Sequence, residues 1–156
     1  MNSSDNLIEN ILKTNNGQDA IIEIDNLLSP IFYKNPNILS VPEKNIVLIE
    51  ELEREINSGG FNSLFFNSPG NYSHEILNAL KTIGSTIFFK ILEKAIALFP
   101  NGEVPKDRDK RQKMLEKIED KADPIWDELD EMFFNYEEDI YSIMIEYITK
   151  NLKDFR

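Results

Sequence analysis

The stretch Glu55–Tyr72, EINSGGFNSLFFNSPGNY, determines where this chain can turn. It places two adjacent glycines, Gly59 and Gly60, between segments whose apolar residues recur at helical spacing. Glycine adopts backbone conformations that other residues avoid. We therefore predict that one helix ends at Asn57 or Ser58 and that the chain turns at the glycines.

The second half of the stretch reads as an anchor followed by another turn. Phe61, Leu64 and Phe65 are predicted to fix a short helix to the core, and Asn67 to Gly70 to turn the chain again. A phosphate-binding loop is disfavoured because its lysine and its preceding strand are both missing. A stacking platform for nucleic acid is disfavoured because no basic residues lie between the aromatic ones. The stretch is interpreted as a structural corner.

Helical periodicity continues outward from the corner in both directions. Apolar residues fall at helical spacing in 5–13, 19–29, 41–57, 73–83, 85–99, 107–122, 123–136 and 140–152. Ser40 and Glu43 form a predicted capping box. Pro30 and Pro36 predict an irregular connection, and Pro124 after Asp123 predicts the start of a new helix.

These patterns predict an all-α fold with about seven to nine helices and no strand. The helix near 85–99 is apolar almost all round and is expected to be buried at the centre. The whole chain, 1–156, is interpreted as one domain, with N-terminal helices in 1–44 and a core in 45–150.

The charge of the chain is strongly and unevenly negative. The net charge is −11, and 107–156 carries fifteen acids against nine bases. Between Asp120 and Glu146 there are ten acids and a single base, Lys121. Such a surface repels nucleic acid and anionic membranes and attracts basic partners, although acidity also keeps proteins soluble.

Several kinds of chemistry have no support in the sequence. Without cysteine there is no disulfide, thiolate nucleophile or zinc–sulfur site. The single histidine, His74, lies in a helical first turn and suggests a surface or capping role. Carboxylates four apart, such as Asp127 and Glu131, are typical of a solvated helix face, so no metal, cofactor or catalytic residue is predicted. With no signal peptide or membrane-spanning run, the protein is expected in the cytoplasm.

A family resemblance rests on the corner and on two later segments. The corner pattern consists of Glu53, Glu55, Asn57, Gly59, Gly60 and Phe61, then Phe65, Phe66, Asn67 and Gly70. Together with AIALFPNGEVPKDRDKRQ at 95–112 and WDELDEMFF at 126–134, it resembles the signature of a family of small acidic bacterial proteins. The family is classed as a domain of unknown function, and its best-known member is a DNA-mimic protein.

The resemblance implies a compact helical fold, a homodimer, and a surface that takes the place of DNA on a basic DNA-binding regulator. No direct contact with nucleic acid or membrane is expected. The residues predicted to bind the partner are Asp120, Asp123, Asp127, Glu128, Asp130, Glu131, Phe134, Glu137, Glu138 and Asp139.

Two other functions remain open from the sequence. The chain could be an interaction module that uses the loop Pro100–Lys106 or the glycine corner, with acidity serving only solubility. An enzyme would require Glu55, Asn57 and Asn67 to line an open pocket at the corner.

Overall fold

The computed structural model describes residues 5–155, which form α-helices and short 3-10 helices with no strand. This confirms the predicted all-α class. The described residues divide into two compact units, one of 5–47 and 139–155 and one of Leu48–Glu138. Whether they fold as the one domain predicted for 1–156 stays a prediction, and residues 1–4 and 156 lie outside the description.

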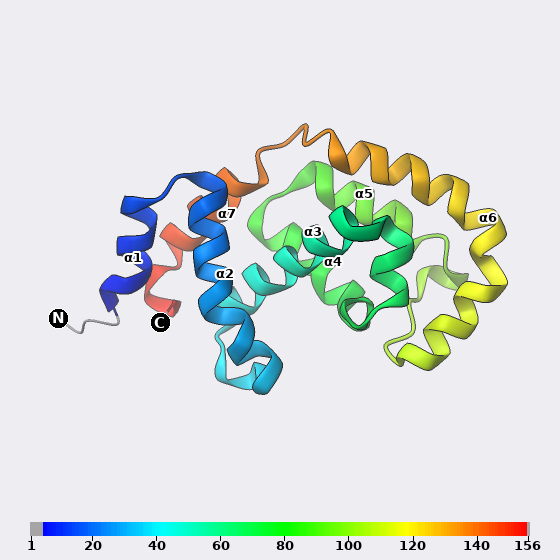
Figure 1. The fold of residues 1–156 in the computed structure, drawn as a ribbon, viewed down its shortest axis with the longest axis horizontal. Coiled ribbons are helices and arrows are strands. Elements are labelled where there is room, and N and C mark those ends of the chain that lie inside the picture. Colours follow the sequence, from blue (N-terminus) through cyan, green and yellow to red (C-terminus); the bar gives the residue numbers. More distant parts are fainter. Residues whose placement is uncertain (1–4, 156) are drawn as a thin grey trace. The chain divides into compact units, whose positions relative to one another are not determined.

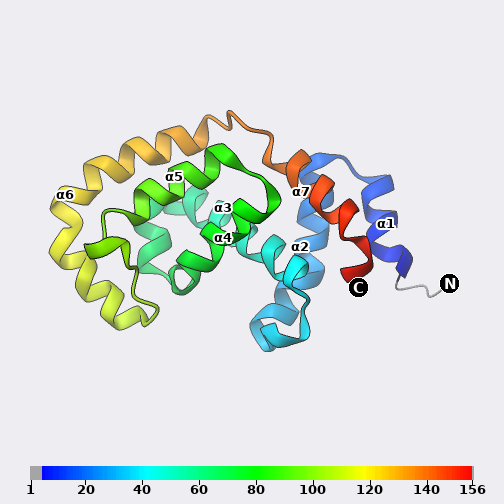
Figure 2. The ribbon, with the colours of Figure 1, turned by 180° about the vertical axis from the view of Figure 1, so that it is seen from behind.

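The first unit brings the two ends of the described chain together. It contains α1 (Asp5–Thr14), α2 (Gly17–Lys34), η1 (Pro36–Ile38), the start of α3 (Val41–Phe66), α7 (Ile140–Lys150) and η4 (Leu152–Asp154). Helix α2 packs against both α1 and α7, so blue and red segments lie side by side in Figures 1 and 2. The packed core includes Ile8, Ile21, Ile24, Leu28, Met144 and Ile148.

The start of α3 shows the predicted capping box. The backbone N–H of Ser40 donates to Glu43 Oε1 at 2.8 Å, and the N–H of Glu43 donates to Ser40 Oγ at 3.2 Å. The irregular connection predicted from Pro30 is wrong, because α2 continues through Pro30 to Lys34. A proline inside a helix removes one backbone donor, and here the packing of α2 outweighs that loss.

The second unit holds the glycine corner. It contains the rest of α3, η2 (Ser68–Tyr72), α4 (Ser73–Ile83), α5 (Thr86–Ile96), η3 (Pro100–Gly102) and α6 (Arg108–Phe134). Helix α5 packs against α4 and α6 and is central to this unit. One face of α5 nevertheless remains exposed, at Lys90, Glu93 and Lys94.

Aromatic side chains fill the core of the second unit. The Phe65 ring lies 4.9 Å from that of Phe99 and 5.1 Å from that of Trp126, centroid to centroid. The indole N–H of Trp126 donates to the Ala95 carbonyl at 3.1 Å, which fixes α6 on α5. Edge-to-face and tilted aromatic contacts stabilise such cores beyond their buried area.

Helix α6 is longer than predicted. It continues through Pro124, so the helix start predicted at Asp123 and Pro124 is wrong. Figure 1 shows α6 bending along its length, as expected when proline removes one internal hydrogen bond. Trp126, Leu129 and Phe133 after the proline continue the buried stripe of Leu115 and Ala122, which keeps one helix against one core.

Candidate functional site

The glycine corner breaks α3 into two helical segments, as predicted. Gly59 (φ −162°, ψ 15°) and Gly60 (φ 77°, ψ −168°) are its two non-helical residues. Phe61 and Phe65 follow and are fully buried. The conformation of Gly60 is one that residues with a Cβ rarely adopt, which explains the glycine there.

Asp130 of α6 is bound to this corner. Its Oδ1 accepts a hydrogen bond from the backbone N–H of Phe61 at 2.8 Å, at the start of the second segment of α3. Burial raises the pKa of Asp130 to about 6, and the charge of Asp127 adds to this, while the Phe61 N–H opposes it. Asp130 was predicted among the partner-binding acids, but its carboxylate is already engaged within the fold.

We expect Asp130→Asn to stabilise the protein at neutral pH. The pKa of Asp130 in the native state lies above its usual value, so the native state binds a proton at this carboxyl more readily than the unfolded chain does. The stability that Asp130 contributes to the wild type therefore falls as the pH rises from about 4 to 7. Asparagine keeps an acceptor oxygen without the charge. The free energy of unfolding should rise by an amount on the order of 1 kcal/mol at pH 7, because Asp130 is partly exposed. This difference from the wild type should vanish near pH 4.

Urea denaturation of both proteins across this pH range measures the difference. Asp130→Ala is the control, because it removes the acceptor and should destabilise by about 1 kcal/mol even where the carboxyl is protonated. A pH-independent difference between wild type and Asp130→Asn would contradict the assigned role.

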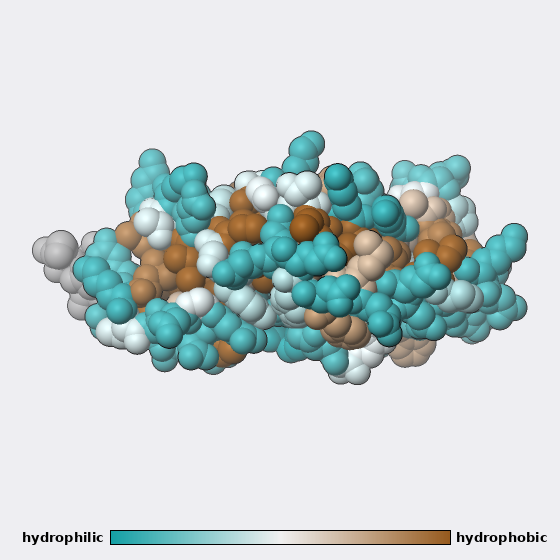
Figure 3. Space-filling model, turned by 90° about the horizontal axis from the view of Figure 1, so that it is seen from above, coloured by the Kyte–Doolittle hydropathy of each residue, from teal (hydrophilic) through white to brown (hydrophobic). Residues whose placement is uncertain are grey.

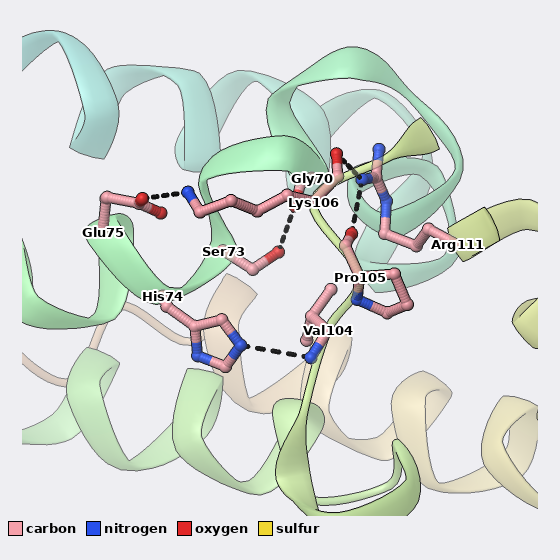
Figure 4. Close-up of polar contacts among 8 residues, drawn as sticks. All are labelled: Gly70, Ser73, His74, Glu75, Val104, Pro105, Lys106 and Arg111. Atoms are coloured by element: carbon pink, nitrogen blue, oxygen red, sulfur yellow. Dashed lines mark hydrogen bonds and ion pairs between the residues drawn. The ribbon is translucent and has the colours of Figure 1, made fainter. Parts of the chain in front are cut away.

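Arg111 holds the other end of the corner. Its guanidinium is fully buried and donates to the backbone carbonyls of Phe65 (2.6 Å), Asn67 (2.8 Å) and Pro105 (2.9 Å). Gly70 lies against it, and a Cβ there would come within 2.8 Å of Arg111 Nε. Burial, with the charge of Arg108, lowers the pKa of Arg111. Figure 4 shows the guanidinium beside Gly70 and Pro105.

The loop between α5 and α6 is fixed by side chains of α4. The backbone N–H of Val104 donates to Nε2 of His74 at 3.1 Å, and Lys106 pairs with Glu75 (Figure 4). His74 therefore has a structural contact with this loop and does not cap a helix through it. Pro105 is held from the other side by Arg111.

The polar residues of the corner satisfy one another. Glu55 Oε2 accepts from Ser63 Oγ at 2.7 Å and from the side-chain amide of Asn67 at 3.1 Å. Asn57 points to solvent as an exposed residue. Glu55 and Asn67 thus hold the segments on either side of Gly60 together, in keeping with a structural corner.

Three further acids of the predicted surface also make hydrogen bonds within the chain. Glu138 accepts from the Ser85 hydroxyl at 2.6 Å and from the first backbone N–H groups of α5. Asp139 caps α7 through Ser142, whose hydrogen bonds lower the pKa of Asp139. Asp123 accepts from the Asn62 side chain at 2.9 Å.

Glu138→Ala is expected to destabilise the protein by about 1 to 2 kcal/mol, because α5 loses the carboxylate at its positive N-terminus. Glu137→Ala is a matched control, since Glu137 is the exposed neighbour and should change stability by less than about 0.5 kcal/mol. Thermal and urea unfolding measure both. Equal effects would show that Glu138 is not a cap.

The remaining acids form an exposed set on and just after α6. Asp120, Asp127 and Glu131 fall on one outward stripe of the helix, while Glu128 and Glu137 are exposed beside and beyond it. No side chain of the described residues pairs with any of these five acids by hydrogen bond or ion pair. Phe134 is 49% exposed, and its ring packs edge-on against Phe133.

On the face seen in Figure 3, hydrophilic side chains predominate and apolar ones are exposed between them. Within residues 5–155, no group of three acids and histidines is arranged to hold a metal ion. None of the described helices is both long and apolar enough to cross a bilayer.

Residues 37–151 match the family described as DMP19-like protein, which covers well over half of the chain. The chain belongs to the DMP19-like family. Comparison with curated proteins and with solved structures gives no significant match. All the exposed acids of α6 and the corner lie inside the DMP19-like region.

Sequence reasoning missed the roles of Asp130 and Arg111. A signal for Arg111 was present, because it lies four residues before Leu115 and therefore on the buried stripe of α6. No comparable signal exists for Asp130, whose partner is the backbone of a residue 69 positions away.

Proposed function

We propose that this DMP19-like protein acts without catalysis, as an acidic interaction protein that occupies the DNA-binding surface of a regulatory protein. The observation that carries the proposal is the stripe of Asp120, Asp127 and Glu131, whose carboxylates are exposed and have no partner among the described residues. Family membership supports the same role, because the resemblance at the corner was to a family with a DNA-mimic member.

The spacing of the stripe supports mimicry of a phosphate backbone. At a rise of ~1.5 Å per residue, Asp127 lies ~10.5 Å along the helix from Asp120, and Glu131 lies ~6 Å further. Three and two phosphate steps of one DNA strand rise ~10.2 Å and ~6.8 Å. Trp126 and Asp130 anchor α6 to α5 and α3, so the helix that carries these carboxylates is held in place. Lysines and arginines that contact DNA could therefore pair with the stripe.

The stripe variant Asp120→Asn/Asp127→Asn/Glu131→Gln is expected to lose the partner. Removal of three charge pairs should weaken binding at least about tenfold at low salt and reduce its salt dependence. The matched control is Glu93→Gln/Glu103→Gln/Asp109→Asn, which changes the net charge equally at three other exposed acids. Both variants should unfold like the wild type.

The measurement is capture from a bacterial lysate on each immobilised protein, with bound proteins identified by mass spectrometry. A DNA-binding protein that is released by salt and displaced by duplex DNA, and that only the stripe variant fails to retain, is the expected result. Equal retention by both variants, or a partner insensitive to salt and DNA, would instead favour the interaction module with merely solubilising acids. The homodimer implied by the resemblance stays a prediction.

A further inference from the structure

The end of α2, the following η1 and the first residue of α3 carry unusually exposed apolar side chains. Tyr33 is 59% exposed, Ile38 67% and Val41 66%, more than any other large apolar residue described as exposed. Single exposed apolar residues are common, but three within nine positions are a feature that needs an explanation. The segment 33–41 that contains them is the bend between the blue α2 and the cyan start of α3 in Figure 1.

An open hollow of about 640 Å³ lies at the same place. Its walls are Pro30, Ile31, Lys34, Asn35 and Ile38, which are predominantly apolar at the surface. The side chain of Asn35 accepts from the Asn37 N–H at 3.1 Å, and the Asn35 N–H donates to Ile31 at 2.8 Å. These bonds fix η1 against the end of α2, so the hollow is a formed feature. Five wall residues do not enclose a small molecule, which favours a protein segment as occupant.

The wall of the hollow carries one charged side chain, that of Lys34. Between Asp25 and Glu43 the only charged residue is Lys34, in a protein of net charge −11. An apolar group that covers the hollow would remove water from the Lys34 ammonium group. Removing water from a charge costs free energy unless an opposite charge pairs with it. The occupant that fits therefore carries a carboxylate next to its apolar side chain.

We propose that the α2–η1 hollow is a docking site for a partner protein segment with an apolar side chain beside a carboxylate. The site is independent of the acidic stripe on α6, since it has the opposite charge. Most of its wall also precedes residue 37, where the DMP19-like region begins. The chain thus carries a second binding surface, contributed largely by helix α2 outside the family region.

Two labelled helical peptides of about 15 residues test the proposal. Both carry leucines at helical spacing, one with glutamates between them and the other with lysines. With the full chain in about 0.15 M salt, which screens the overall negative charge, the glutamate peptide should shift the amide resonances of residues 30–41. Ile38→Ser should weaken this binding at least about fivefold, and Lys34→Gln should weaken it for the glutamate peptide.

Ile38 and Lys34 are both exposed, so neither variant should disturb the fold, which circular dichroism checks. Ile125→Ser, at an exposed apolar residue of α6, is the matched control and should leave the shifts unchanged. The proposal is overturned if residues 30–41 show no shifts with the glutamate peptide. It is equally overturned if Ile38→Ser leaves the shifts intact, or if the lysine peptide binds these residues as well.

Discussion

Gly60→Ala is expected to destabilise the protein by about 3 to 5 kcal/mol, a large part of the stability of a typical domain. A Cβ at Gly60 would lie 2.1 Å from Oδ2 of Asp130, far inside contact distance. Asp130 would have to move and would lose its hydrogen bond to the Phe61 N–H. The backbone adds a second cost, because at φ 77° and ψ −168° a residue with a Cβ is strained by about 1 to 3 kcal/mol.

Urea denaturation of four proteins separates the two causes: wild type, Gly60→Ala, Asp130→Ala and the double variant. The steric overlap needs both the Cβ at position 60 and the Asp130 carboxylate. Gly60→Ala should therefore lower the free energy of unfolding clearly less when Asp130 is already alanine. Gly84→Ala measures backbone strain alone, since Gly84 has φ 90° and open space around its Cβ position. Strictly additive effects in the double variant would show that the carboxylate and Gly60 do not interact.

Arg111→Met is expected to lower the free energy of unfolding by about 3 to 5 kcal/mol. Methionine fills much of the volume but leaves the carbonyls of Phe65, Asn67 and Pro105 without their donor. These acceptors belong to the backbone, so no single substitution can remove them. Lysine should not rescue the fold, because one ammonium group cannot reproduce the planar array of donors.

Arg108→Met is the matched control for Arg111→Met. Arg108 also contacts the corner, through the Phe66 carbonyl at 3.1 Å and the Phe66 ring, but it is exposed. Its loss should cost less than about 1 kcal/mol. Free energies of unfolding from urea titrations compare the two. A difference below about 1 kcal/mol between them would contradict the role assigned to the buried guanidinium.

Local sequence patterns predicted the turns of this fold well. The capping box at Ser40, the break at Gly59 and Gly60, and the end of the predicted 73–83 helix all depend on residues within a few positions of one another. The same local rules failed at Pro30 and Pro124. There the buried stripes of α2 and α6 continue across the proline, and tertiary packing outweighs the lost hydrogen bond.

The acidic site was only partly predictable for the same reason. Sequence identifies the acids near the end of α6 but not which of them the fold has already engaged. Asp130 and Glu138 bind backbone groups 69 and 51 or more positions away, and no local pattern reports such contacts. Asp127 is an aspartate like Asp130, and Glu131 is a glutamate like Glu138. Both lie among similar neighbours in the sequence, yet both remain exposed.

The carboxylates of this protein are of two kinds, those hydrogen-bonded within the fold and those exposed to solvent, and the two kinds can change differently among relatives. Asp130 and Glu138 accept hydrogen bonds from backbone groups of the fold, whereas Asp120, Asp127 and Glu131 are exposed and form no hydrogen bond or ion pair within the described residues. Under the proposed function, a homologue that retains the first pair and has lost the second set is expected to keep the same scaffold and to bind this kind of partner poorly. On the same proposal, total acidity is a poor guide to partner binding within the family, and the identities at these five positions are the informative ones.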